Sequence, residues 1–335
     1  MTLNGSRIGT AVMLICVFTC GWLAKGAWDT YRSPNQEKTE VRKGQYEFVN
    51  PLLECKGAES LISREVIPFR ERLVKAVQEK TDRKMVRTMS VYFRDLNDGP
   101  WFGIKYEDIF YPASLLKVPL MMAFLDEAQR NPWILQKKVK YEGDRKDYNS
   151  LEYIKPEHYV EYGKTYTVDE LLYLMITYSD NNAAVLLGNI GWAYTKRVYN
   201  AFGLPQLNEM GAEYPISVQN YASFFRVLYN ASFLSPDMSN KALNMLAADH
   251  FMRGIEAGVP PGVKVANKFG ERESGNERQF HDCGIVYYPN YPYLLCIMTK
   301  GDDTEKLISA VEDISRITYA EVDRQFRLRS AAESK

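Results

Sequence analysis

The sequence predicts an α+β protein in which one antiparallel five-stranded sheet is flanked by helices and interrupted by an all-helical domain. Apolar and polar residues alternate over 89–94, and a turn signal at 97–99 leads to a partner strand at 101–104. Helical periodicity then continues for about 140 residues. Three further strands are expected at 263–269, 284–288 and 293–299, before a closing helix. Strands from both ends of the domain therefore form one sheet, with the helical part inserted between them.

The composition is typical of a globular protein with a sizeable core. Apolar residues make up 46% and charged residues 25% of the 335 positions. Lysine plus arginine and aspartate plus glutamate balance at 42 each. Bulk charge therefore gives no support for a nucleic-acid partner.

The first 32 residues predict a membrane anchor or a signal segment. Residues 8–24 carry no charge, and this length is close to the minimum that crosses a bilayer as a helix. Small residues around Lys25 also suit a cleavable signal peptide. Residues 33–60 form the expected tether. We expect the domain that follows to lie outside the cytoplasm, on a single-pass anchor in the cell membrane or secreted after cleavage.

Residues 61–330 form the expected globular domain. Its α/β part comprises 61–112 and 255–330, and its helical part comprises 113–254. A capping box at 167–170 marks one helix start. Further helices are expected at 67–78, 114–130, from 182, at 217–229 and at 240–248. A cleft where the two parts meet is a common place for a functional site.

The cysteine and histidine pattern predicts no metal site and no cofactor. Cys283 and Cys296 either form a disulfide across a hairpin or remain two buried thiols. The histidines lie far apart in the sequence, without metal-binding spacing; they are His158, His250 and His281.

Ser114 and Lys117 have the spacing of a nucleophile and its base. Residues three apart share one face of a helix, so the hydroxyl and the amine can meet. A desolvated lysine with a depressed pKa can take the proton of a serine hydroxyl. A helix N-terminus also favours the oxyanion that forms after attack. Taken alone, the pair also fits a serine cap followed by a solvated lysine.

Two further segments carry polar residues suited to a substrate. Ser179-Asp180-Asn181 lies on a short loop between helices, where Ser179 can shuttle a proton and Asn181 can hold a substrate amide. Lys268 lies on the strand at 263–269, and Gly270 permits close backbone approach. The alternative interpretations are ordinary helix caps and an exposed strand lysine.

Together the three segments resemble the penicillin-recognising serine enzymes, most closely the class A β-lactamases, over roughly 67–322. The matching stretches are 112–119, 175–184 and 258–270. The resemblance implies the β-lactamase/transpeptidase-like fold. It also implies an acylated nucleophile at Ser114, a base or proton relay at Lys117 and a proton donor to the leaving nitrogen at Ser179. Amide binding at Asn181, carboxylate binding at Lys268 and an oxyanion hole made by the backbone N–H groups of Ser114 and Glu271 follow from the same resemblance.

The resemblance is incomplete where the acyl-enzyme would be hydrolysed. Leu204 stands where class A enzymes place the glutamate that activates water. Glu209 and Glu213, in the following loop, are candidates for that acid/base role, or are solvated carboxylates.

The strand motif also departs from the family pattern. Phe269 replaces a hydroxyl residue that helps bind the substrate carboxylate, and Cys283 stands where many class A enzymes carry an arginine. Arg272 or Arg278 are candidates to supply that charge. His281-Asp282 either belongs to the site or forms a surface pair.

The expected function is that of a monomeric β-lactamase-related serine hydrolase, acylated at Ser114 by a β-lactam or a D-alanyl peptide of peptidoglycan. The first alternative is a D,D-peptidase or penicillin-binding protein with slow deacylation. The second is a non-catalytic module that uses the same fold to bind peptidoglycan or a protein.

Overall fold

The structure, a computed structural model, describes residues 41–42, 46–49, 52–54, 66–97, 100–142, 146–204, 214–248 and 251–333. The chain divides into two compact units, and all of these residues belong to the second, which comprises 41–54 and 58–335. The expected anchor at 8–24 and the candidates Glu209 and Glu213 lie outside the described residues. No helix in the described part is long and apolar enough to cross a membrane. The anchor and the domain boundaries therefore stay predictions.

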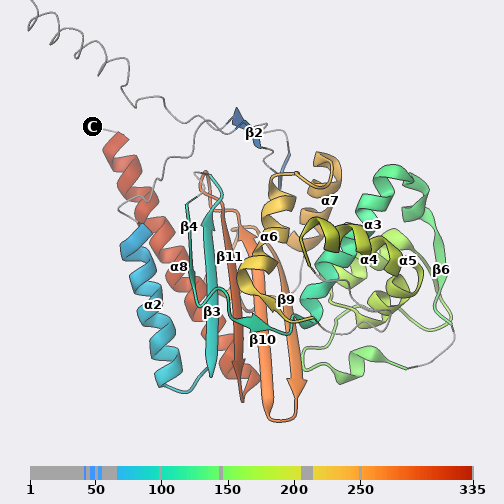
Figure 1. The fold of residues 1–335 in the computed structure, drawn as a ribbon, viewed down its shortest axis with the longest axis horizontal. Helices are drawn as coiled ribbons and strands as arrows, with labels where there is room; N and C mark the ends of the chain where they lie inside the picture. Colours follow the sequence, from blue (N-terminus) through green and yellow to red (C-terminus); the bar gives the residue numbers. More distant parts are fainter. Residues whose placement is uncertain are drawn as a thin grey trace, which may run out of the picture. The chain divides into compact units, whose positions relative to one another are not determined.

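One five-stranded antiparallel sheet organises the second unit, as predicted (Figure 1). Its strand order is β4-β3-β11-β10-β9, so strands from the two ends of the domain pair directly along β3 and β11. The strands are β3 (Thr88–Asp95), β4 (Trp101–Ile104), β9 (Val265–Ser274), β10 (Glu277–Val286) and β11 (Tyr293–Gly301). β9 forms one edge, and it carries Lys268, Gly270 and Glu271.

The prediction that β10 starts near Gly284 is wrong, because the strand begins at Glu277. Its first residues are mostly polar, so apolar alternation gives no signal there. In the fold, Gln279, His281 and Asp282 are buried and hydrogen-bonded. Satisfied polar side chains thus replace apolar ones in the interior of this strand.

Helices cover both faces of the sheet (Figure 1). On one face, α2 (Val66–Asp82) and the long α8 (Thr304–Glu333) pack over an apolar cluster that includes Leu73, Phe93 and Val311. On the other face, α6 (Val218–Tyr229) packs against β3 and β11 and begins the contact with the helical part. Helices therefore cover both faces of the sheet, and β9 is the edge strand that lies against the helical part.

The helical part carries the predicted capping box at Thr167 and Glu170. Helix α7 starts earlier than expected because Ser235 caps it and Pro236 occupies its first turn. The other helices are η1 (Ala113–Leu116), α3 (Lys117–Arg130), η2 (Pro132–Gln136), η3 (Tyr148–Leu151), α4 (Val168–Thr177), α5 (Asn181–Ala201), α7 (Pro236–Ala247) and η4 (Glu256–Gly258). Short strand pairs are β1 (Val41–Arg42) with β2 (Leu52–Glu54), β5 (Ile109–Phe110) with β8 (Ile216–Ser217), and β6 (Lys138–Lys140) with β7 (Thr165–Thr167).

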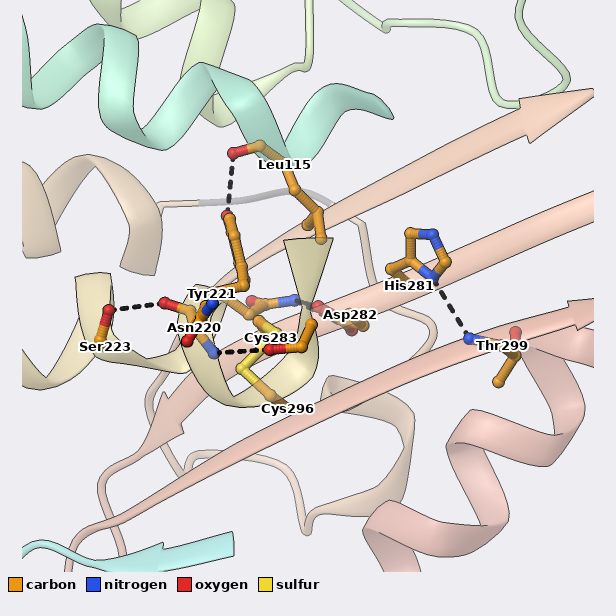
Figure 2. Close-up of a disulfide and its surroundings, with 11 residues drawn as sticks. Leu115, Asn220, Tyr221, Ser223, His281, Asp282, Cys283, Cys296 and Thr299 are labelled. Carbon is orange, nitrogen blue, oxygen red and sulfur yellow. Dashed lines mark hydrogen bonds between the residues drawn. A yellow bond between two sulfur atoms is a disulfide. The ribbon is translucent and has the colours of Figure 1, made fainter. Parts of the chain in front are cut away.

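Cys283 and Cys296 form a disulfide between β10 and β11 (Figure 2). The two residues lie directly opposite each other in the strand register, and both are fully buried. Of the two alternatives from the sequence, the disulfide is the one that the structure contains. Cys283 therefore adds a covalent link beneath the sheet face that carries α6.

Candidate active site

Ser114 lies on a tight turn rather than on the α-helix itself. Residues Ala113–Leu116 form a 3₁₀ turn, and α3 begins at Lys117. Ala113, directly before the serine, has a φ of +50°, a left-handed conformation that a residue with a Cβ adopts only at a cost. Surrounding contacts must therefore hold this turn in place.

Two side chains of β10 hold the backbone of Tyr111, just before the turn. Tyr111 N donates to Gln279 Oε1 at 3.1 Å, and His281 Nε2 donates to Tyr111 O at 3.0 Å. Thr299 N donates to His281 Nδ1 at 3.2 Å, which fixes the tautomer (Figure 2). Burial lowers the pKa of His281 to about 4, so the ring stays neutral. His281 is thus a buried support of the turn, and the surface-pair interpretation is wrong.

Asp282 is equally buried and has a structural role. It accepts hydrogen bonds from Ile255 N at 2.7 Å and from Asn267 Nδ2 at 3.1 Å. These contacts tie β10 to β9 and to the segment before η4. Asp282 therefore belongs to the frame of the site and does not reach the pocket.

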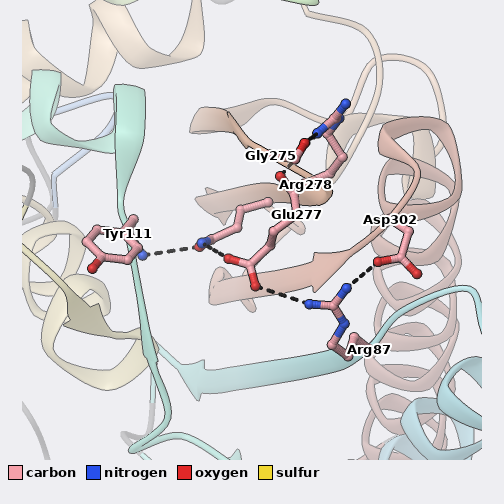
Figure 3. Close-up of polar contacts among 7 residues, drawn as sticks. Arg87, Tyr111, Gly275, Glu277, Arg278 and Asp302 are labelled. Carbon is pink, nitrogen blue, oxygen red and sulfur yellow. Dashed lines mark hydrogen bonds and ion pairs between the residues drawn. The ribbon is translucent and has the colours of Figure 1, made fainter.

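The two arginines proposed to supply a positive charge are engaged elsewhere. The Arg272 guanidinium lies 4.5 Å from the centre of the Tyr111 ring. Arg278 Nη1 donates to Gly275 O at 2.7 Å within the β9–β10 turn (Figure 3). Neither side chain lines the pocket that contains Ser114.

A network of ion pairs at the same end of the sheet continues the support of Tyr111 (Figure 3). Gln279 Nε2 donates to Glu277 Oε1 at 2.8 Å, and Arg87 pairs with both Glu277 and Asp302. The network joins β10 to the residue before β3 and to the loop before α8.

Gly270 lets β9 lie against the Ser114 turn. A Cβ at Gly270 would lie 2.7 Å from Pro112 O and 3.0 Å from Leu115 N, closer than packed atoms allow. Tyr221 on α6 holds the turn from behind, because its hydroxyl donates to Leu115 O at 2.9 Å (Figure 2). The close approach that the sequence predicted for this glycine is thus made to the nucleophile turn.

Lys117 contacts Ser179 with its side-chain amine. Lys117 Nζ lies 3.0 Å from Ser179 Oγ and 2.6 Å from Ser179 O. Burial, reinforced by the nearby charge of Lys268, lowers the pKa of Lys117 to about 7, while Glu152, Asp180 and Glu271 oppose this shift. Ser179 itself has a φ of +59°, a strained conformation of the kind found at functional sites. A neutral amine at Lys117 is therefore accessible near neutral pH.

Asp180, for which the sequence gave no role beyond a cap, holds the loop on the far side of the pocket. It caps α5 and accepts hydrogen bonds from Asn149 Nδ2 and Val160 N, both at 2.8 Å. It is fully buried. The middle residue of the Ser-Asp-Asn motif thus fixes the 148–160 segment against the helix that carries Asn181.

Glu152, on that segment, is a site residue that sequence reasoning missed. Asn181 Nδ2 donates to Glu152 Oε1 at 2.6 Å and also approaches Tyr148 O at 3.3 Å. Glu152 lies between two short elements and belongs to no motif, so nothing in the sequence pointed to it. A search for carboxylates between the first two motifs would have included it without ranking it.

The Glu271 side chain lies beside Glu152. Glu271 Oε1 accepts a hydrogen bond from Ile154 N at 2.7 Å, and both carboxyl-bearing residues line the same pocket. Burial and the neighbouring Glu152 raise the pKa of Glu271 to about 7. Sequence reasoning assigned Glu271 only through its backbone N–H, and its carboxyl group is an additional feature of the site.

These residues surround a pocket of about 290 Å³. Four of the predicted site residues line it, namely Ser114, Lys117, Asn181 and Glu271, together with Glu152. The other lining residues are Ala113, Leu116, Leu120, Ala184, Trp192, Thr195 and Tyr199. A larger hollow of about 630 Å³ between α4 and α7 contains none of the predicted site residues.

Lys268 and Phe269 lie behind the pocket wall. Lys268 is fully buried, and its Nζ lies 4.1 Å from the centre of the Phe269 ring. Phe251 packs on the same ring at 4.2 Å between centroids. The interpretation of Lys268 as an exposed strand lysine is therefore wrong. Phe269 is a core residue where a hydroxyl was expected from the resemblance.

The fold and this site define a penicillin-recognising type of serine-enzyme architecture. A profile described as the β-lactamase enzyme family matches residues 71–322. The chain therefore belongs to the β-lactamase enzyme family. The comparison with curated protein sequences found no match.

Solved structures with the same fold include both β-lactamases and a penicillin-binding protein. A leucine-to-glutamate variant of PBP-A, in an acyl-enzyme complex with penicillin G, is 22% identical, with a TM-score of 0.62 over 76% of this chain and 97% of that chain. A β-lactamase from Chitinophaga pinensis is 18% identical, with a TM-score of 0.64 over 75% and 99%. The class A β-lactamase of the last common ancestor of Gram-negative bacteria is 24% identical, with a TM-score of 0.63 over 74% and 98%. At these identities the likeness shows the fold.

Within the described residues, no three His, Cys, Asp or Glu side chains gather in a way that would hold a metal ion.

Proposed function

We propose that the protein is a serine hydrolase that forms an acyl-enzyme on Ser114 with a β-lactam or a D-alanyl peptide amide. The proposal rests chiefly on the contact between Lys117 Nζ and Ser179 Oγ at 3.0 Å, because Lys117 lines the same pocket as Ser114. A lysine with a pKa lowered to about 7 is a base at neutral pH.

The proposed acylation moves one proton through this contact. The neutral Lys117 amine takes the proton of Ser114 Oγ, and the oxygen attacks the carbonyl carbon of the amide. Backbone N–H groups of Ser114 and Glu271 stabilise the resulting oxyanion. Ser179 gives its hydroxyl proton to the leaving nitrogen and regains one from the Lys117 ammonium. The carbon–nitrogen bond breaks, and Lys117 returns to its neutral form.

Release of the acyl group distinguishes the two catalytic candidates. A β-lactamase needs a carboxylate that activates water, and Leu204 stands where the family resemblance places that glutamate. This residue favours a D,D-peptidase or penicillin-binding protein with slow deacylation. The leucine-to-glutamate variant of PBP-A, which shares the fold, has been solved as an acyl-enzyme complex with penicillin G, and this supports acylation of the serine without deciding between the two candidates. Glu209 and Glu213 remain the proposed candidates for a hydrolytic carboxylate.

We further propose that the domain works outside the cytoplasm, where peptidoglycan and β-lactams are found. The Cys283–Cys296 disulfide supports this location because such bonds persist in oxidising compartments. The uncharged segment at 8–24 supports a membrane anchor or export signal.

Incubation with a fluorescent penicillin, followed by intact-mass measurement, tests acylation directly. We expect an adduct of one penicillin on the wild-type protein and none on Ser114→Ala. Ser223→Ala, a change to a serine on α6 outside the pocket, is the matched control and should react like wild type. A folded wild-type protein that forms no adduct and turns over no substrate would overturn the enzyme proposal in favour of a non-catalytic binding module.

A further inference from the structure

The recognition wall of the pocket carries two carboxyl groups. Glu152 comes from the segment before α4, and Glu271 comes from the edge strand β9. Each accepts a hydrogen bond from a fixed donor, Glu152 from Asn181 Nδ2 at 2.6 Å and Glu271 from Ile154 N at 2.7 Å. Both side chains are thus held by fixed contacts in the wall of the same pocket.

The features that would bind a substrate carboxylate are replaced on the same wall. Phe269 contributes an aromatic ring to the core, and Cys283 is buried in a disulfide. Arg272 lies over Tyr111, and Arg278 is bound to the β9–β10 turn. Neither arginine therefore lines the pocket, whose wall carries the carboxyl groups of Glu152 and Glu271.

Lys268 is present, but its contacts suit a role other than binding a substrate carboxylate. It lies over the Phe269 ring, and its charge acts on Lys117. The charge of Lys268 helps to keep the Lys117 amine neutral, and this role in attack does not require a carboxylate on the substrate.

From these contacts we propose that the Glu152–Glu271 pair makes the pocket select substrates that carry a cationic group beside the scissile bond over substrates that carry a carboxylate there. The inference rests on the proposed acylation of Ser114. A cation near the pair is attracted by the two carboxyl groups, whereas an anion meets like charge in a partly buried site.

Three thioesters of benzoylglycine, differing only in the charge of the leaving thiol, measure this preference. The first leaving thiol, thiocholine, carries a quaternary ammonium, which has no free lone pair and so cannot itself be acylated. The second, 3,3-dimethylbutanethiol, is the neutral isostere of thiocholine. The third, mercaptoacetate, carries a carboxylate. In each case a bond forms between Ser114 Oγ and the carbonyl carbon, the carbon–sulfur bond breaks, and the thiol leaves with the serine proton. Release of the thiol is followed with a colorimetric thiol reagent.

For the wild-type protein we expect kcat/KM to be on the order of tenfold higher for the thiocholine ester than for the mercaptoacetate ester, with the neutral ester between them. Glu152→Gln and Glu271→Gln each replace one carboxyl group with a neutral amide of the same shape, so each should lower this ratio, and the double variant should bring it to within about threefold of one. Glu161→Gln is the matched control, because Glu161 is exposed and pairs with Lys164 outside the pocket. Its ratio should equal that of wild type.

The outcomes separate this inference from the proposed function. A wild-type ratio near or below one, or a ratio that both Gln variants leave unchanged, overturns the inference while thioester cleavage and the penicillin adduct preserve the serine hydrolase. Failure of all three esters and of penicillin to acylate the folded protein overturns both proposals together. The ratio of kcat/KM values is measured on the wild-type protein itself. It therefore tests the inference even if a Gln variant folds poorly.

Discussion

The two sides of the pocket differ in how closely they follow the family pattern. The attack side, which we define as Ser114, Lys117 and Ser179, contains every group that the resemblance implies. The recognition side, which we define as Glu152, Phe269 and Glu271, contains an aromatic core residue and two carboxyl groups in place of hydroxyl and cationic groups. Attack on a carbonyl imposes one geometry, whereas recognition has to match only one class of substrate. Under the two proposals, the reaction type and the substrate class are specified by separate elements.

The largest effect is expected from changes to Lys117, which test whether the attack side works as described. Lys117→Arg keeps a positive charge but cannot act as a base, and Lys117→Met removes the amine. Both should slow acylation by about 10²- to 10⁴-fold, the usual contribution of a general base. Stopped-flow fluorescence with a fluorescent penicillin measures the rate.

Lys138→Met, a change to an exposed lysine on β6, is the control and should leave that rate unchanged. Acylation of Lys117→Arg at the wild-type rate would show that another group activates Ser114. The attack side as defined above would then lack the group that acts as the base.

The attack side was predictable from the sequence because its residues lie in short local motifs. Ser114 and Lys117 line the pocket, and Lys117 Nζ lies 3.0 Å from Ser179 Oγ. The recognition side was less predictable, because Glu152 and Glu271 line the same pocket but lie far apart in the chain. Spacing rules for helices and strands do not report such contacts.

The sheet shows the same division between local and long-range information. Alternation predicted β3, and the fold confirms it with Met89, Val91 and Phe93 in the core. The first half of β10 escaped prediction because Gln279 and His281 are polar. Their place in the interior depends on partners such as Tyr111, which approach only in the folded chain.

A smaller effect is expected at Gly270, where the two sides meet. Gly270→Ala places a methyl group against Pro112 O and Leu115 N, so the turn or the strand must shift. We expect a loss of about 1–3 kcal/mol in the free energy of unfolding, the usual cost of overpacking, with slower acylation. Urea unfolding measures the first quantity.

Gly188→Ala provides a control of opposite sign. Gly188 lies in α5, and a Cβ there meets no atom within 4 Å. Alanine should stabilise this helix position by up to about 1 kcal/mol. If Gly270→Ala proved as harmless as Gly188→Ala, close contact between the strand and the nucleophile turn would not be needed, and the two sides would be mechanically independent.

The smallest effect, a shift in the pH dependence of acylation, measures the electrostatic coupling between the two sides. The Lys117 amine is a base only when deprotonated, so acylation by the neutral thioester should rise as the pH increases through about 7. Lys268 lowers the pKa of Lys117, whereas Glu152, Asp180 and Glu271 raise it. Lys268→Met should therefore move the midpoint to higher pH, and Glu152→Gln should move it to lower pH. Each shift should be about one pH unit or less, since each removes one neighbouring charge. Midpoints that move in the same direction, or stay fixed in both variants, would show that the recognition side does not tune the base that it faces.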